Sequence, residues 1–325
     1  MEAKKVNTKI MSGFVDSVRI GEPTTFQNLT VLPIFSEQGR SNGFSLLDDA
    51  IRTDKFRVTE VSDSGTVPEL KVINQLDINV LIIDGEELVG AKQNRIVNTT
   101  ILVGKETEVV IPVSCVEHGR WHYRTKQFST GRSHLYADLR RKKSKSVHRN
   151  LQACASFHSN QSEIWDDISE KAAKFSVNSE THAMNDIYET HEGRIKEYEK
   201  QFTVAPDQIG FVAFIGGKIV GIDIFGSTSV IPKVYKKLLR GYVLDALDHD
   251  RTLDRQKEES AKPEVSGTKE FHDQAKAFLG RIKSSKKEVY KSVGEGDELR
   301  FGNKQVNGFA LINNEEVVHM AAFAE

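Results

Sequence analysis

Apolar and polar residues alternate, or apolar residues run together, over many short stretches of the chain, which is the pattern of β-strands with one or two buried faces. The stretches that fit are 26–35, 56–61, 69–73, 80–83, 88–91, 95–103, 107–115, 209–215, 218–225, 288–292, 299–302, 308–312 and 316–322. Asp84 and Gly85 predict a two-residue hairpin turn, since both residues tolerate a positive φ. The first half of the chain therefore predicts an antiparallel meander.

A second pattern, with apolar residues three and four positions apart, predicts amphipathic helices. It covers residues 44–53, 161–175, 179–202, 232–247 and 270–282. Pro232 suits the first turn of its helix, where a missing N–H costs nothing. The two patterns together predict an α+β fold, in which antiparallel β-hairpin meanders pack with several amphipathic helices.

The order of these elements predicts one large α+β domain over residues 1–325. Its parts are a β-rich region (20–125), a helical region (160–202), a β-hairpin plus helix (208–248), a mobile charged loop (249–269), and a C-terminal helix with hairpins (270–325). Residues 83–89, 215–221 and 312–318 share an apolar–turn–polar–apolar pattern. Convergence of tight hairpins and a repeated hairpin unit both explain this echo, and both interpretations stay open.

Composition narrows the classes of partner. Lys and Arg number 45 against 46 Asp and Glu, so no overall field favours nucleic acid or an anionic membrane. No apolar run is long enough to span a bilayer, and the N-terminal residues lack the apolar core of a secretion signal, so we expect a cytoplasmic protein. The basic run at 140–149 is predicted to be a solvated loop.

The number and spacing of cysteine and histidine residues argue against a disulfide-stabilised protein and against a structural zinc site. Two cysteines, Cys115 and Cys154, are too few for a disulfide framework. His118, His122 and His134 follow Cys115 at a spacing that matches no closed zinc site. We therefore expect neither a metal nor a cofactor.

Polar residues interrupt the apolar strands between residues 80 and 121 more densely than packing requires. They are Glu86, Glu87, Lys92, Gln93, Asn94, Arg95, Asn98, Cys115, Glu117, His118, Arg120 and Trp121. Two antiparallel strands joined near Gly104 bring the start of the first beside the end of the second. The prediction is that one rim holds two of these groups: Gln93, Asn94 and Arg95, where one strand gives way to the next, and Cys115, Glu117, Arg120 and Trp121, after the end of its successor.

Such a rim holds the groups that a nucleotide or sugar-phosphate site needs. Guanidinium groups bind phosphate, amides read hydroxyls and base edges, carboxylates accept protons or ribose hydroxyls, and an indole stacks on a base. In the alternative interpretation, Arg95 and Arg120 form structural ion pairs with Glu87 and Glu117. Cys115 is either an activated thiol nucleophile or a small residue that ends a buried strand.

Three motifs carry a resemblance to a known family: DGEELVGAKQNR at 84–95, IPVSCVEHGRW at 111–121 and QSEIW at 161–165. They resemble the domain family named for its association with ADP-ribosylglycohydrolases and rhodanese-phosphatases, whose members are largely uncharacterised. The resemblance extends to residues 29–35 and 211–227 and so covers most of the first 250 residues. One departure is His118, where we expect glutamine, and another is the charged loop at 249–269.

The resemblance, joined to the chemistry of the rim, predicts binding of an ADP-ribose-like or NAD-derived nucleotide small molecule, with its hydrolysis as a further hypothesis. The candidate catalytic residues are Glu87, Glu117 and Cys115, and the candidate ligand-binding residues are Glu86, Gln93, Asn94, Arg95, Asn98, Arg120, Trp121 and Gln161. The alternative is a non-catalytic sensor or adaptor protein whose polar cluster is structural. Neither the substrate nor the oligomeric state follows from the sequence.

Overall fold

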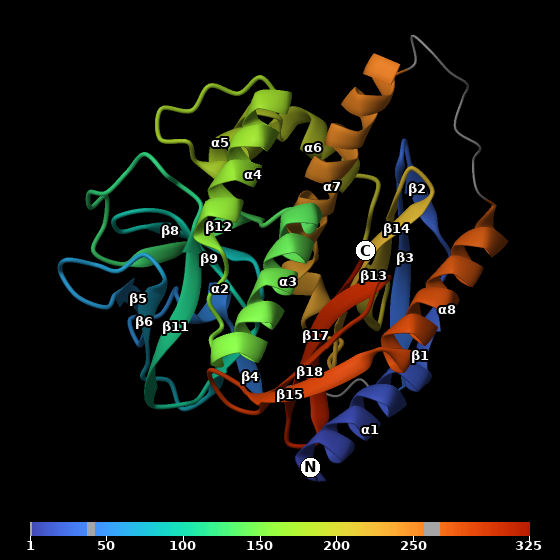
Figure 1. Ribbon diagram of the computed structural model, residues 1–325, viewed down its shortest axis with the longest axis horizontal. Helices are drawn as coiled ribbons and strands as arrows, with labels where there is room; N and C mark the ends of the chain where they lie inside the picture. The colour runs from blue at the N-terminus through green and yellow to red at the C-terminus, as the bar shows by residue number, and fades with distance from the viewer. Residues whose placement is uncertain (1, 38–42, 257–266) are drawn as a thin grey trace.

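An α+β fold emerges from the computed structural model, which describes residues 2–37, 43–256 and 267–325 (Figure 1). The largest sheet runs in the order β1-β3-β13-β14-β18-β17-β16-β15, with β2 also paired to β3. Its strands are β1 (Val18–Ile20), β2 (Thr24–Phe26), β3 (Leu29–Ser36), β13 (Gln208–Ile215), β14 (Lys218–Phe225), β15 (Lys286–Lys291), β16 (Asp297–Gly302), β17 (Val306–Asn313) and β18 (Glu316–Ala324). All of its pairings are antiparallel, as predicted.

Two smaller sheets form the other β-rich body, on the left of Figure 1. A six-stranded sheet has the order β12-β8-β9-β11-β6-β5 and curls into a half-barrel. Its strands are β5 (Phe56–Glu60), β6 (Glu69–Asn74), β8 (Glu86–Gly90), β9 (Arg95–Val97), β11 (Thr107–Cys115) and β12 (Phe128–His134). The third sheet, β10-β7-β4, contains β4 (Phe44–Leu46), β7 (Asn79–Ile82) and β10 (Ile101–Val103).

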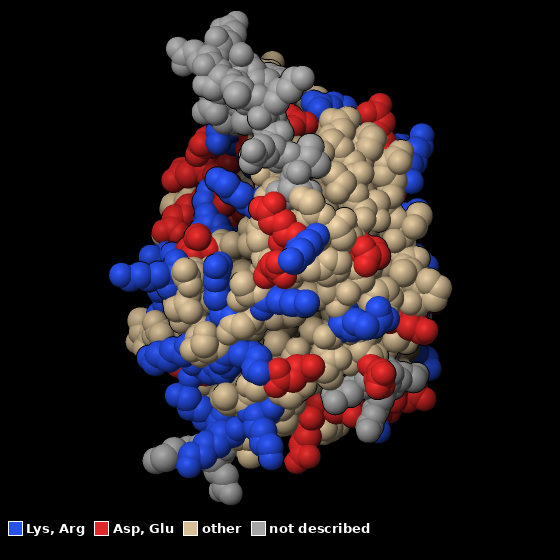
Figure 2. Space-filling view, turned by 90° about the vertical axis from the view of Figure 1, so that its right-hand side faces the viewer, with Lys and Arg blue, Asp and Glu red and all other residues tan. Residues whose placement is uncertain are grey.

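The helices pack on both faces of the large sheet and between the two β bodies (Figure 1). They are α1 (Glu2–Ser17), α2 (Leu47–Ala50), α3 (Ala137–Cys154), α4 (Gln161–Lys174), α5 (Met184–Thr190), α6 (Glu192–Glu199), α7 (Ile231–Gln256) and α8 (Thr268–Ser284). Because strand residues alternate between faces, Phe214 meets Phe271 of α8 whereas Phe211 meets Tyr242 of α7. Acidic and basic side chains are interspersed over the face with α1 and α8, in keeping with the near-zero net charge (Figure 2).

Three hydrophobic clusters account for most of the buried apolar residues. One lies between the large sheet and α1 with α8, and another lies where α3 to α7 meet both β bodies. The third fills the interior of the six-stranded sheet, with Val58, Leu88, Val97 and Val113 as members. The end of this third cluster is where strands β9 and β11 carry Arg95 and Cys115.

Two predictions about the first meander are wrong. The predicted strand 95–103 is two strands, because β9 pairs with β8 and β11 whereas β10 pairs with β7. Residues 98–100 make the crossing, and Lys143 donates to the carbonyls of Val97 and Asn98 there. Asp84 and Gly85 do not join a hairpin, since β7 and β8 belong to different sheets, although Gly85 has the expected positive φ of 81°.

Several helix and loop predictions also need correction. The basic run at 140–149 lies in α3 rather than in a loop. Residues 249–256 of the predicted charged loop continue α7 and residues 268 and 269 begin α8, whereas residues 257–266 lie outside the described part of the chain. Residues 179–202 contain the two helices α5 and α6, and residues 44–53 contain β4 and the short α2. The sequence patterns did not predict α1 or β12.

The three echoing segments have different structures. Gly216 and Gly217 turn β13 into β14, and Asn314 and Glu315 turn β17 into β18, all four with positive φ. These two are real hairpins in the large sheet. The segment 83–89 passes between sheets instead, so a hairpin unit repeated three times is wrong.

Candidate functional site

Strand register places Arg95 beside Cys115, as the sequence predicts. β9 and β11 are antiparallel, with Cys115 opposite Arg95 and Val113 opposite Val97. Since Val97 and Val113 face the interior of the six-stranded sheet, Arg95 and Cys115 lie on that same face, at its end. The two polar stretches therefore meet.

A buried ion pair between Glu117 and Arg120 closes one side of this region. Arg120 donates from Nε to Glu117 Oε1 at 2.9 Å and from Nη2 to Oε2 at 2.6 Å. Its remaining donors reach the carbonyl oxygens of Ala91 and Gly90 at 2.6 and 3.1 Å, and Asn94 Oδ1 at 3.2 Å. The Asn94 amide N–H also donates to Glu117. These contacts tie the two loops together, which is the role of a structural network.

The charge state of Glu117 follows from those contacts. Burial raises the pKa of Glu117, but hydrogen bonds from Arg120 and Asn94 outweigh burial, so the pKa lies below its ordinary value. Glu117 is therefore a carboxylate at neutral pH, with both oxygens in use. A general base needs a free oxygen within reach of its proton donor.

Arg95 differs from Arg120 in having unused donors. Its side chain is fully buried, and Nη1 donates to Gln93 Oε1 at 2.9 Å and to the Asn94 carbonyl at 3.5 Å. Nε and Nη2 have no partner among the described residues. Burial lowers the pKa of Arg95 from its ordinary value. A buried cation with two free N–H donors lowers the stability of the folded protein unless an anion accepts hydrogen bonds from those donors.

Trp121 covers this guanidinium from outside. The Arg95 Cζ lies 5.6 Å from the indole ring centroid, and the Lys92 Nζ lies 5.4 Å from the same ring. Trp121 is 45% exposed, so part of its ring faces solvent. Gln93, Arg95, Cys115 and Trp121 together form what we call the Arg95 rim.

Cys115 is held as a thiol at this rim. Its Sγ donates to Gln93 Oε1 at 3.1 Å and to the Glu117 carbonyl at 3.3 Å. Burial raises the pKa of the Cys115 thiol, and the nearby Arg95 charge only partly opposes this. Because the thiolate is the nucleophile, these contacts do not activate Cys115.

Glu86 and Glu87 lie away from the Arg95 rim. Lys237 donates to Glu86 Oε1 at 3.1 Å, and burial raises the pKa of Glu86. Glu87 pairs with Ile96 in the register whereas Leu88 pairs with Arg95, so Glu87 and Arg95 leave opposite faces of the sheet. Both Glu87 oxygens lack a partner among the described residues, and burial, aided by the charge of Glu117, raises its pKa to about 8.

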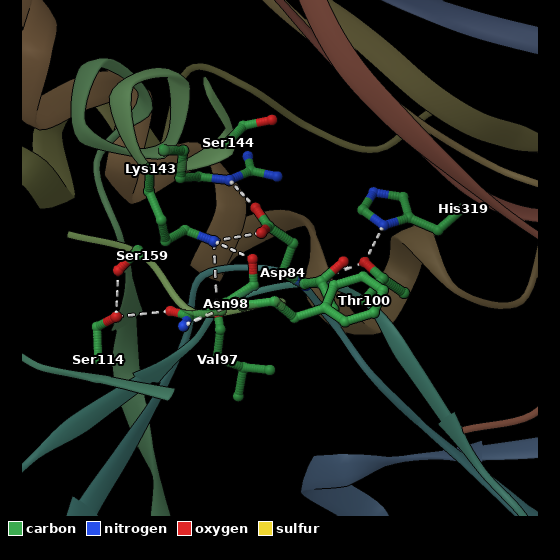
Figure 3. A network of polar contacts seen from close by, with 12 residues as sticks. Asp84, Val97, Asn98, Thr100, Ser114, Lys143, Ser144, Ser159 and His319 are labelled. Atoms are coloured by element: carbon green, nitrogen blue, oxygen red, sulfur yellow. Dashed lines mark hydrogen bonds and ion pairs between the residues drawn. The ribbon is translucent and has the colours of Figure 1, made fainter. Parts of the chain in front are cut away.

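Asn98 and Gln161 have structural contacts. Gln161 accepts from the Cys115 N–H at 2.8 Å and donates to the Cys115 carbonyl at 2.9 Å, which completes an edge of β11 beyond the end of its pairing with β6. Asn98 Oδ1 accepts from Ser114 at 2.7 Å, as Figure 3 shows, and its amide donates to the Phe157 carbonyl. Neither side chain contacts the Arg95 guanidinium through a hydrogen bond.

A buried ionic network that the sequence did not predict lies between the β bodies. Arg140 holds Asp223 with two hydrogen bonds of 2.7 and 2.9 Å and reaches Asp84 at 3.3 Å. Lys143 also pairs with Asp84, and burial lowers the pKa of Lys143 to about 8 (Figure 3). A helical spacing of three residues puts both cations on one face of α3, a signal hidden within the basic run.

One part of this network has the order of a hydrolase triad. Thr100 Oγ1 lies 2.7 Å from His319 Nδ1, and His319 Nε2 lies 3.3 Å from Asp223 Oδ1. All three side chains are fully buried, and Arg140 already occupies both oxygens of Asp223. The burial and the ion pair favour a structural link between the sheets over catalysis.

A second missed residue, Glu60, lies near the Arg95 rim. Its Oε1 accepts from the Lys92 N–H at 3.3 Å, and its Oε2 is buried with no partner among the described residues. Glu60 occupies a core position in the alternation that places Phe56 and Val58 inside the sheet. Charged residues are rare at core-facing strand positions, so the alternation in the sequence could have identified Glu60 as a candidate residue.

Metal sites and membrane spans have no candidate in the part of the chain that the structure describes. Within residues 2–37, 43–256 and 267–325, no group of three or more His, Cys, Asp or Glu side chains could hold a metal ion. Over the same part of the chain, every helix is too short or too polar to cross a membrane.

The fold and the site define an α+β protein in which a sealed polar network stands beside one incompletely satisfied arginine. The chain belongs to the ARPP-1 family, described as the ARG and Rhodanese-Phosphatase-superfamily-associated Protein domain, whose family model matches residues 17–323. No curated protein and no solved structure matched the chain. The family description associates the domain with ARG and rhodanese-phosphatase proteins, which agrees loosely with a nucleotide-related role.

Proposed function

We propose that the Arg95 rim binds an ADP-ribose-like or NAD-derived nucleotide small molecule. The observation that carries the proposal is the fully buried Arg95 guanidinium, whose Nε and Nη2 donors have no partner among the described residues. A phosphate oxygen pair matches the fork of a guanidinium and would complete both donors. Trp121 offers a half-exposed ring on which a nucleobase can stack.

The contacts support binding more strongly than hydrolysis. Glu117 is ion-paired, Cys115 is a buried thiol, and Glu87 leaves the opposite face of the sheet from Arg95. A hydrolase at this rim would therefore need a conformational change that frees a base. Binding needs only the donors and ring that are already in place.

A substitution of Arg95 by Met tests the proposal, because Met fills similar space without a charge. We expect ADP-ribose or NAD to raise the melting temperature of the wild-type protein and to have no effect on Arg95→Met. The free variant should be more stable than wild type, since it removes a buried cation with two unfilled donors. Arg132→Met, at an exposed position on β12, is the matched control and should keep the ligand response.

A nucleotide response of Arg95→Met equal to that of wild type would contradict the proposal. The second candidate function, a non-catalytic sensor or adaptor, is favoured by the sealed contacts of Glu117, Arg120 and Asn94. It predicts the opposite pair of results. No nucleotide would shift the wild-type melting temperature, and Arg95→Met would be less stable than wild type.

A further inference from the structure

Glu60 projects into the same end of the half-barrel as Arg95. It is the last residue of β5, and its side chain lies on the inner face with Phe56 and Val58. Strand β5 and the loop after β8 meet there, since the Lys92 N–H donates to Glu60 Oε1. The Glu60 charge favours the charged form of Arg95, as expected for two groups in the same region.

Glu60 and Arg95 are buried opposite charges that do not pair with each other. Glu60 is 7% exposed with Oε2 unpartnered, and Arg95 is fully buried with Nε and Nη2 unpartnered, within the described residues. Burying two such charges costs free energy that a direct ion pair would partly recover. Glu60 therefore has one acceptor, and Arg95 two donors, without a partner among the described residues.

Gly65 packs closely beside this acceptor, where a larger residue would crowd it. A Cβ at Gly65 would lie 3.2 Å from Glu60 Oε2 and 3.2 Å from the Lys92 Cδ, and Gly65 has a φ of 70°. A surface cavity of about 580 Å³ starts at the same place, with Glu60, Val61 and Tyr123 in its lining. The Lys92 Nζ lies 5.1 Å from the Tyr123 ring, so one cation links this cavity to Trp121.

We infer that Glu60 accepts a hydrogen bond from a sugar hydroxyl of the ligand whose phosphate binds Arg95. The inference rests on the proposed function and narrows its substrate class to ribose phosphates. A simple anion such as inorganic phosphate would satisfy Arg95 but would meet repulsion from the Glu60 carboxylate. A ribose phosphate carries both the anionic oxygens and the O–H donors that the two side chains require.

Glu60→Gln tests this with little change in shape. The Lys92 N–H holds the amide oxygen at the Oε1 position, so the amide NH₂ takes the place of Oε2 and replaces an acceptor with a donor. Calorimetric titration with ADP, 2′,3′-dideoxy-ADP and ADP-ribose, on wild type and variant, gives affinity ratios in which general effects on the fold cancel. Glu108→Gln, an exposed position on the same sheet, is the control.

In wild type we expect ADP to bind more tightly than dideoxy-ADP, or ADP-ribose more tightly than ADP, depending on which ribose Glu60 contacts. Glu60→Gln should reduce that preference by about tenfold, the effect of one hydrogen bond to a charged group. Unchanged ratios in Glu60→Gln would overturn the inference while leaving nucleotide binding intact. Absence of binding of all three compounds to wild type would overturn the proposed function and the inference with it.

Discussion

Replacing Glu87 by Gln should make the protein more stable at alkaline pH. Burial raises the pKa of Glu87 from 4.5 to about 8, so the folded protein holds a proton that the unfolded chain releases. Such a group contributes stability that is fully present below the unfolded pKa and is lost as pH rises through the folded pKa. Gln keeps the shape of the protonated side chain but has no proton to lose.

The size of the effect follows from the two pKa values. Each pKa unit corresponds to about 1.4 kcal/mol, so a change from 4.5 to about 8 corresponds to about 5 kcal/mol. We expect the free energy of unfolding of Glu87→Gln, relative to wild type, to increase by up to about 1.4 kcal/mol per pH unit between pH 5 and 8. Above pH 8 to 9 the difference should become constant.

Urea denaturation followed by circular dichroism, at constant ionic strength from pH 5 to 9, measures this difference. Glu180→Gln is the control, because Glu180 is exposed on the segment before α5 and its substitution should give a flat difference. A Glu87→Gln difference that is equally flat would refute the reasoning. It would mean that Glu87 is ionised in the folded protein, with a partner that satisfies its oxygens.

Two further predictions concern the sealed contacts. Glu117→Gln should lower the free energy of unfolding by about 3–5 kcal/mol at pH 7, because it breaks a buried ion pair with Arg120. This loss should become smaller below about pH 4.5, since a carboxyl with a depressed pKa stops stabilising the folded protein as it is protonated. Urea titrations at pH 7 and pH 4 check this, and an equal loss at both would count against it. Gln161→Ala should lower the free energy of unfolding by about 2 kcal/mol, because it leaves the Cys115 N–H and carbonyl without partners. An unchanged urea midpoint would contradict this structural role of Gln161.

Local patterns predicted the parts of the fold that depend on nearby residues. The hairpin at Gly216 and Gly217 is such a part, because a short connection and strand alternation determine it. The two polar stretches also meet, at Arg95 and Cys115, but the strand that carries Arg95 changes sheets after Val97 and does not form the single predicted hairpin. The break in the predicted strand 95–103 could not be predicted in the same way. It depends on Lys143, a residue of a later helix, which donates to the carbonyls at the crossing.

The same limit applies to charged residues within α3. The basic run at 140–149 has the composition of a solvated segment, yet Arg140 and Lys143 are fully buried. Their partners, Asp84 and Asp223, are far away in sequence, since Asp84 lies in the turn between β7 and β8 whereas Asp223 lies in β14 of the large sheet. Burial of a cation follows from where its counter-charge lies, and one sequence does not show that.

The contrast between Arg95 and Arg120 shows how a structure separates a candidate binding group from a structural one. In the sequence the two residues are equivalent, since each is an arginine in a polar stretch at a strand end. In the fold Arg120 uses its donors on Glu117, Asn94 and backbone carbonyls, whereas Arg95 leaves Nε and Nη2 unused. Unfilled donors on a fully buried cation lower the stability of the free protein, and a ligand that fills them recovers that free energy on binding. When Arg95 is replaced, the stability of the free protein and the affinity for the ligand should therefore change in opposite directions.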